Sequence, residues 1–290
     1  MTTQLKARKL RQILGRMPSA VVCLSGGVDS ALLLAMAAEV LGDRVTAFTA
    51  DSPALPREEL AQTAALVRQL GVRHVVRATH ELENADYAAN PSDRCYFCKT
   101  ELLRTAAAVA AELGCQEVLI GTTADDLGGH RPGLRAAGEQ GARHPLVEAD
   151  LKKTEVRELA QQLELPVWDK PEMACLASRL PYGTPVTRER LGRIERFEQA
   201  LGALGLTGLR VRLHDPVARL ELPPEQIARA ASSELREEIV RIGRACGFVY
   251  VTLDLAGYRR GAMNELLPAP ERGPDAAQVT RALKGGTTQH

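Results

Sequence analysis

The sequence predicts an α/β protein in which a parallel β-sheet covered by helices is followed by a smaller α+β domain. Short apolar segments alternate with longer helical segments as far as about residue 165, a pattern typical of parallel sheets that are buried on both faces. A loop with several prolines then interrupts the alternation over residues 166–185. The chain of 290 residues also exceeds the usual size of one domain, so two domains are expected.

The first domain is expected to alternate strands and helices. Pro56 favours the start of one helix, and Gly114 favours the end of another. Because ligands bind at the carboxyl ends of parallel strands, Ser25, Asp51 and Gly121 should lie at one edge of the sheet. The expected elements are a surface helix over 1–14, strands over 20–24, 44–50, 73–77 and 117–120, and helices from about Val28 and over 56–70, 101–113 and 151–163.

The second part of the chain has an α-β-β-α-β order, which predicts a small antiparallel sheet. Its expected elements are a helix over 188–204, strands over 209–214 and 217–222, helical sequence over 224–246 and a strand over 248–253. We therefore expect a first domain at 1–170, an active-site loop and linker at 171–187, a substrate-binding or oligomerisation domain at 188–257, and a tail at 258–290 that is mobile from about Ala269.

The composition is that of an ordinary folded protein, with 45% hydrophobic and 25% charged residues. The 37 basic and 36 acidic residues nearly cancel, so no global charge attracts nucleic acid. No segment approaches the roughly 20 apolar residues needed to cross a bilayer, and the N-terminus lacks the apolar core of a signal peptide. We expect a cytoplasmic protein that binds no membrane and keeps its cysteines reduced.

The segment SGGVDS lies between a buried-type strand and a helix and predicts an anion site. Adjacent glycines let backbone N–H groups approach an anion, while the helix N-terminus adds positive potential. The loop lacks the lysine and spacing of the common NTPase P-loop. It resembles the PP-loop of ATP pyrophosphatases, although a turn that merely caps a structural helix is the alternative. The residues concerned are Ser25, Gly26, Gly27, Val28, Asp29 and Ser30.

A pair of carboxylates, Asp125 and Asp126, follows the strand expected at 117–120. Two carboxylates that face a polyphosphate would need a hard cation, and Mg²⁺ is the usual one. The alternative is an aspartate that caps the next segment. Beside an ATP-type loop, metal and ATP binding is the favoured interpretation.

Cys95 and Cys98 form a Cys-x-x-Cys pair, whose sulfurs can reach one metal around a tight turn. Cys175, in an irregular loop, is the third ligand that we choose. A four-iron cluster with three protein thiolates leaves one iron to bind external sulfide. A redox pair, or a zinc site completed by Cys175 and a fourth ligand, is the alternative. We expect the remaining cysteines to be small buried residues: Cys23, Cys115 and Cys246.

Arg210 and Arg212 alternate along one expected strand and so share a face, and Arg219 and Glu221 repeat this spacing on the next strand. Two arginines on one face form a good phosphate clamp. A solvated sheet face with cross-strand ion pairs explains the pattern equally well.

Four strings together resemble the LarE family of PP-loop enzymes. They are SGGVDS, NPSDRCYFCK (90–99), GTTADDLGGHRPGLRAA (121–137) and CLASRLPYG (175–183), within a match over about 19–253. The resemblance implies a Rossmann-like, adenine nucleotide α-hydrolase-like sheet and a sulfur insertase for the nickel-pincer nucleotide cofactor. In the family, ATP adenylates a carboxylate of pyridinium-3,5-biscarboxylic acid mononucleotide. A sulfur nucleophile then displaces AMP, and two rounds give the bisthiocarboxylic product.

The resemblance also implies roles for individual residues. The loop at 25–30 would hold pyrophosphate, and the family's oligomer suggests a homohexamer. By motif, the catalytic residues would be Cys175, Asp29 and Lys99, and the Mg²⁺ ligands would be Asp29 and Asp125. Gly121 and Arg135 would be further nucleotide-binding residues. The residues at the substrate phosphate would be Arg210, Arg212 and Glu221.

This chain departs from the sacrificial members of the family, which donate sulfur from one cysteine and leave dehydroalanine. Those members need no Cys-x-x-Cys pair, whereas this chain has one. It looks more like the cluster-dependent variant, in which Cys95, Cys98 and Cys175 hold a [4Fe-4S] cluster and accept sulfide or another sulfur donor. Sacrificial chemistry at Cys175 is the internal alternative.

Two other functions compete with this interpretation. A tRNA thiolase would also combine a PP-loop with a three-cysteine cluster, and basic clusters at 6–11 and 188–196 keep that function open. The net charge of +1 gives it weak support. A zinc-stabilised nucleotide-binding scaffold is the non-enzyme alternative.

Overall fold

The computed structural model describes residues 1–127, 132–171 and 174–259. These residues form two compact units. The first unit contains residues 1–81 together with the chain from 93 to 171, and the second contains 82–92 together with 174–259. The expected mobile tail from Ala269 lies outside the described residues.

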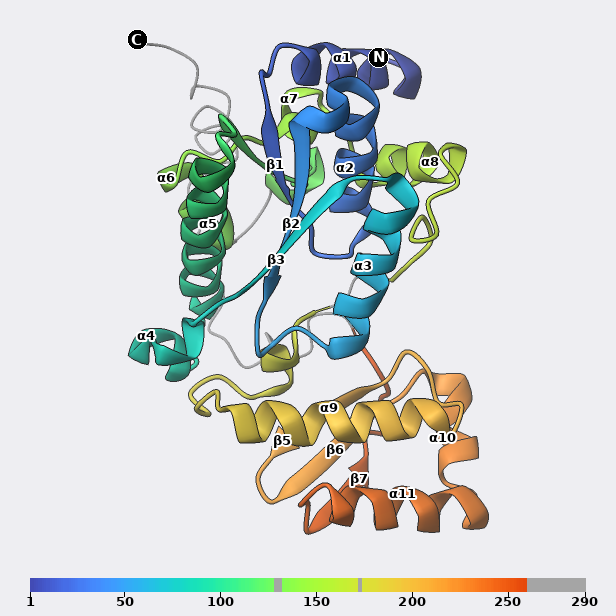
Figure 1. The fold of residues 1–290 in the computed structure, drawn as a ribbon. Coiled ribbons are helices and arrows are strands. Elements are labelled where there is room, and N and C mark those ends of the chain that lie inside the picture. Colours follow the sequence, from blue (N-terminus) through green and yellow to red (C-terminus); the bar gives the residue numbers. More distant parts are fainter. Residues whose placement is uncertain (128–131, 172–173, 260–290) are drawn as a thin grey trace. The chain divides into compact units, whose positions relative to one another are not determined.

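The first unit contains a four-stranded parallel sheet in the order β3-β2-β1-β4, which confirms the predicted α/β class (Figure 1). The chain leaves β1 toward β2 on one side, whereas β4 pairs with β1 on the other. Such a change of direction is where open α/β sheets bind ligands, beyond the carboxyl ends of the strands. The strands are β1 Ala20–Cys23, β2 Val45–Asp51, β3 Arg73–Ala78 and β4 Glu117–Ile120.

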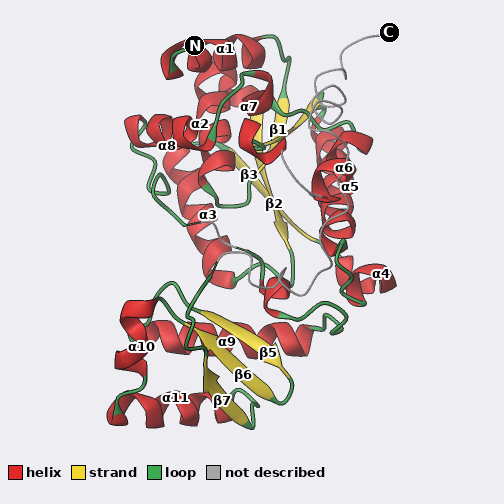
Figure 2. Ribbon diagram, turned by 180° about the vertical axis from the view of Figure 1, so that it is seen from behind, coloured by secondary structure: helices red, strands yellow, loops and turns green. Residues whose placement is uncertain are grey.

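Helices cover both faces of this sheet, as Figures 1 and 2 show. The buried strand β1 supplies both cores, because its alternate residues point to opposite faces. Ala20 and Val22 join the core with α1 and α2, while Val21 and Cys23 join the core with α5. The helices are α1 Thr3–Gly15, α2 Val28–Leu41, α3 Arg57–Leu70, α5 Arg94–Leu113, α6 Pro132–Glu139, α7 Pro145–Glu148 and α8 Lys153–Gln162.

None of the helices within the described part of the chain has the length and apolar character needed to cross a membrane.

The second unit has the expected order of elements but not the expected sheet. Strands β5 and β6 are antiparallel, whereas β6 and β7 are parallel, so the prediction of an antiparallel sheet was wrong for the last strand. The reason is the connection: two helices carry the chain back to the end of the sheet where β6 began. The elements are α9 Arg188–Ala203, β5 Arg210–His214, β6 Val217–Glu221, α10 Pro224–Ala230, α11 Ser233–Ala245 and β7 Tyr250–Leu253.

Residues 82–92, with the short helix α4 Ala85–Ala88, belong to the second unit. The boundary expected at residue 170 does not account for this segment. Its anchor is Asn90, which is fully buried and has a positive φ of 57°. The Asn90 side chain donates to the carbonyls of Pro181 (2.8 Å) and Thr184 (3.0 Å). The Asn90 carbonyl accepts from the Gly183 N–H at 2.9 Å.

We expect Asn90→Ala to lower the free energy of unfolding by about 2 kcal/mol, because two half-buried carbonyls lose their donors and alanine tolerates a positive φ poorly. Urea denaturation followed by circular dichroism measures this change. Asn90→Gly is the matched control, since glycine removes the donors but adopts the backbone conformation without strain. Unchanged unfolding midpoints for both variants would contradict the anchoring role.

Candidate functional site

The SGGVDS loop connects β1 to α2 and closes on itself through the Ser30 hydroxyl. The Ser30 Oγ accepts from the Ser25 backbone N–H at 3.2 Å and donates to the Gly27 carbonyl at 3.1 Å. Gly26 has a φ of +79°, and a Cβ there would come within 2.6 Å of the Thr63 Oγ1. The loop therefore presents backbone N–H groups at the N-terminus of α2, which is the arrangement expected of an anion site.

Gly121, directly after β4, lies against the beginning of α2. A Cβ on this glycine would come within 2.6 Å of the Ser30 backbone nitrogen and 2.8 Å of the Asp29 carbonyl carbon. No side chain fits in so short a distance. The end of β4 and the SGGVDS loop therefore meet, as the sequence predicted for the carboxyl edge of the sheet.

The two carboxylates after Gly121 differ in role. Asp126 turns back on its own loop, where its Oδ2 accepts from the backbone N–H and the hydroxyl of Thr123, both at 2.9 Å. Asp125 instead reaches α8, where its Oδ2 accepts from the Lys153 backbone N–H at 2.7 Å. Both contacts are of the capping kind, because Asp126 accepts from its own turn and Asp125 accepts from the first N–H of α8. The role of Asp125 at the ATP site stays a prediction.

Sequence reasoning missed Lys153, because no motif surrounds it. Its ammonium Nζ lies 2.5 Å from the Asp29 Oδ2, so one residue contacts both carboxylates that we expect to bind Mg²⁺. Both are oxygen ligands, which Mg²⁺ prefers. The residues present therefore fit a magnesium-bound polyphosphate.

Helix α5 begins at Arg94, so Cys95 and Cys98 lie on its first turns and not in the tight turn that we expected. Residues three apart share one helix face, so both thiols can still serve one metal. Cys95 is exposed and Cys98 half-buried. Across the described residues, no group of three His, Cys, Asp or Glu side chains is arranged to hold a metal ion. Cys175 belongs to the second unit, and the three-cysteine centre stays a prediction.

Lys99 and Arg135 differ in their surroundings. The positive charge of Lys99 adds to burial in lowering the pKa of the buried His144 imidazole to about 4. Arg135, on α6, stacks on the Tyr96 ring at 4.4 Å and lies 3.8 Å from the Glu139 carboxylate. The catalytic role of Lys99 and the nucleotide-binding role of Arg135 stay predictions.

The other three cysteines are not equally buried. Burial raises the pKa of the Cys23 thiol to about 12, so this cysteine is protonated at neutral pH and a poor nucleophile. Cys246 is also buried and has a raised pKa. Cys115 is only half-buried, although it packs against the core beside α5.

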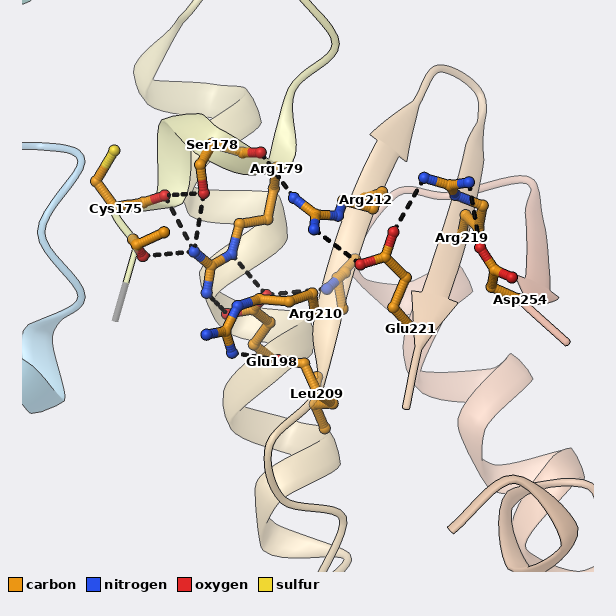
Figure 3. A network of polar contacts seen from close by, with 12 residues as sticks. Cys175, Ser178, Arg179, Glu198, Leu209, Arg210, Arg212, Arg219, Glu221 and Asp254 are labelled. Atoms are coloured by element: carbon orange, nitrogen blue, oxygen red, sulfur yellow. Dashed lines mark hydrogen bonds and ion pairs between the residues drawn. The ribbon is translucent and has the colours of Figure 1, made fainter. Parts of the chain in front are cut away.

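In the second unit, Arg210 and Arg212 lie on one face of β5, as predicted (Figure 3). Arg212 donates to the Glu221 carboxylate and to the Ser178 carbonyl, both at 2.8 Å. Glu221 also accepts from Arg219 at 3.0 Å. The pair between Arg212 and Glu221 is therefore a cross-strand ion pair, but Arg210, Arg212 and Glu221 are only 7%, 5% and 1% exposed, so this part of the face is not solvated.

Sequence reasoning also missed Arg179 and Glu198, the centre of the network in Figure 3. Arg179 has no exposed surface, and its guanidinium contacts both Glu198 carboxylate oxygens at 3.0 and 3.1 Å. It also donates to the carbonyls of Ala174 (2.5 Å) and Cys175 (3.0 Å). Glu198 in turn accepts from the Val211 N–H at the outer edge of β5, at 2.9 Å. The backbone that carries Cys175 is thus held to the sheet.

This network joins arginines and carboxylates from several elements of the second unit. The arginines are Arg179, Arg212 and Arg219, and the acids are Glu198, Glu221 and Asp254. Arg210 lies beside them on β5 and donates to the Leu209 carbonyl at 2.7 Å.

Known proteins are similar to this chain over most of its length. Residues 11–197 match the asparagine synthase family model. An uncharacterised protein of Synechocystis is 45% identical over 90% of this chain and 98% of its own length. Pyridinium-3,5-bisthiocarboxylic acid mononucleotide synthase of Lactiplantibacillus plantarum is 39% identical over 85% of this chain and 89% of that enzyme. A subunit of the glutamine-hydrolysing GMP synthase of Methanothermobacter thermautotrophicus is 25% identical over 77% of this chain and 65% of that protein.

Gly121→Ala should lower the free energy of unfolding by about 2 kcal/mol and weaken ATP binding, because the added methyl group forces β4 away from the SGGVDS loop. Thermal melting and calorimetric titration with α,β-methylene-ATP measure the two effects. Gly15→Ala is the control, since a Cβ at that position meets only the Val40 Cγ1 at 3.7 Å. Equal melting temperatures and equal nucleotide Kd values for the two variants would refute the close contact between Gly121 and the start of α2.

Glu198→Gln should destabilise the second unit by about 2 kcal/mol, because it leaves the buried Arg179 without its carboxylate. The same change should speed alkylation of Cys175 by iodoacetamide, since Arg179 holds the backbone carbonyls of Ala174 and Cys175. Peptide mass spectrometry reports the Cys175 rate separately from other cysteines. Glu189→Gln, at an exposed position of the same helix, serves as the control. An unaltered alkylation rate would exclude this restraint.

Proposed function

The chain belongs to the asparagine synthase family and, within it, to the LarE family, and from this premise we propose that it is an ATP-dependent sulfur transferase. Its substrate would be pyridinium-3,5-biscarboxylic acid mononucleotide, and its product the bisthiocarboxylic nucleotide of nickel-pincer cofactor biosynthesis. The observation that carries the proposal is 39% identity, over most of both chains, to the enzyme named for that product.

The first half-reaction would take place at the SGGVDS loop. The loop backbone and the N-terminus of α2 would hold the leaving pyrophosphate, while Asp29 and Asp125 would hold Mg²⁺. A substrate carboxylate oxygen attacks the α-phosphorus of ATP, and the bond from that phosphorus to the β-phosphate oxygen breaks. The products are an acyl adenylate and pyrophosphate, and the acyl carbon becomes open to a nucleophile.

The second unit would supply a place for the substrate phosphate. Arg210 and Arg212 lie on one face of β5, and planar guanidinium groups on one face suit the recognition of a phosphate. Glu221 fixes Arg212 through the 2.8 Å contact, which keeps its planar donor group oriented.

For the second half-reaction we propose that Cys95, Cys98 and Cys175 bind a [4Fe-4S] cluster, which would offer an iron atom for external sulfide. The shared face of Cys95 and Cys98 at the start of α5 supports two of these ligands. Sulfur attacks the acyl carbon, and AMP leaves with the former carboxylate oxygen. The sacrificial alternative uses the Cys175 sulfur instead. We further propose that the protein is cytoplasmic, because reduced thiols are required, and that it forms a homo-oligomer, as the family resemblance suggests.

The proposal predicts pyrophosphate release that depends on both ATP and the dicarboxylate nucleotide, with mass-spectrometric appearance of the thiocarboxylate. Asp29→Asn should reduce the rate at least about tenfold, because it removes a charge that faces the polyphosphate metal. If the protein hydrolyses ATP in the presence of tRNA but not in the presence of the mononucleotide, the tRNA thiolase function replaces the proposed one.

The sulfur source is decided by anaerobic reconstitution with iron and sulfide. Cluster chemistry predicts Mössbauer or EPR signals that Cys95→Ser and Cys98→Ser abolish, and multiple turnovers with sulfide. Sacrificial chemistry predicts one sulfur per chain and a Cys175 peptide lighter by about 34 Da, the mass of hydrogen sulfide. One sulfur per chain and the lighter Cys175 peptide, observed without any cluster signal, would overturn the cluster proposal.

A further inference from the structure

Lys153 is the first residue of α8 and contacts two loops that are far apart in sequence. Its backbone N–H donates to the Asp125 Oδ2 at 2.7 Å, and its ammonium lies 2.5 Å from the Asp29 Oδ2. Asp29 follows β1, and Asp125 follows β4. One residue thus joins the carboxylates that flank the predicted ATP site.

The start of α8 is itself fixed from two sides. The Ala124 N–H donates to the Leu151 carbonyl at 2.8 Å, which ties the Asp125 loop to the segment before α8. Lys6 of α1, only 5% exposed, donates to the Asp150 carbonyl at 2.6 Å and to the Glu155 carboxylate at 2.9 Å. The Lys153 backbone therefore has little freedom relative to either loop.

The charges explain why a lysine suits this position. The ammonium forms an ion pair with the Asp29 carboxylate, whereas the Lys153 backbone N–H donates to Asp125. The Lys153 and Asp29 side chains are only 25% and 20% exposed, so water screens the contact incompletely. The ammonium also adds positive charge beside a site for a polyanion.

We propose that Lys153 is a positioning residue of the ATP site, which holds Asp29 in register with Asp125 so that both carboxylates receive magnesium-bound ATP together. This inference rests on the proposed use of ATP but not on sulfur transfer. Lys153 acts through Asp29, so loss of its side chain should matter little once Asp29 has lost its charge. The backbone bond to Asp125 survives any substitution, which isolates the contribution of the ammonium.

The test is calorimetric titration of the full-length protein with α,β-methylene-ATP and Mg²⁺. Lys153→Met should raise the Kd about tenfold or more, while Lys153→Arg, which keeps the charge, should recover most of the affinity. Lys152→Met is the matched control, because Lys152 is the exposed neighbour and loses the same charge. Circular dichroism checks folding, and Lys153→Gln provides a second neutral variant.

A double-mutant cycle distinguishes positioning from a general structural effect. In the Asp29→Asn background, Lys153→Met should change the Kd by less than about threefold, since the partner charge is gone. Equal losses in both backgrounds, or the same Kd for Lys153→Met and wild type, would overturn the inference. If the wild-type protein does not bind the nucleotide at all, the proposed function is contradicted. A wild-type protein that binds the nucleotide with the same Kd as Lys153→Met contradicts only the role of Lys153.

Discussion

The ATP-type site depends on one steric constraint, the contact between Gly121 and the backbone of Asp29 and Ser30. A Cβ added at Gly121 would lie 2.6 Å from the Ser30 nitrogen, so only a residue without a side chain allows β4 to reach the first turn of α2. The parallel pairing of β1 with β4 sets that approach. The loop geometry, the placement of Asp125 and the reach of Lys153 all follow from it.

In the second unit, the interaction on which other contacts depend is the buried ion pair between Arg179 and Glu198. Arg179 satisfies Glu198, and Glu198 in turn satisfies a backbone N–H at the outer edge of β5. Removing either partner would leave an uncompensated buried charge, which is far more costly than losing an exposed pair. The loop that carries Cys175 and the strand that carries Arg210 are therefore stabilised by the same two side chains.

Local patterns predicted much of this structure, because short apolar runs and glycine-rich turns determine their own conformation. The strands of the first sheet, the SGGVDS loop and the shared face of Arg210 and Arg212 were all predictable in this way. Lys153 and the pair Arg179 and Glu198 were not, since their partners lie far away in sequence. The direction of β7 also depended on where two helices returned the chain, which periodicity does not encode.

The place of residues 82–92 has a consequence for biosynthesis. The chain enters the second unit, returns to complete the first sheet with β4, and only then builds the rest of the second unit. On the ribosome, Asn90 therefore emerges about ninety residues ahead of the carbonyls of Pro181 and Thr184 that it binds. Its burial must wait until those partners are translated, so the two units cannot mature strictly one after the other.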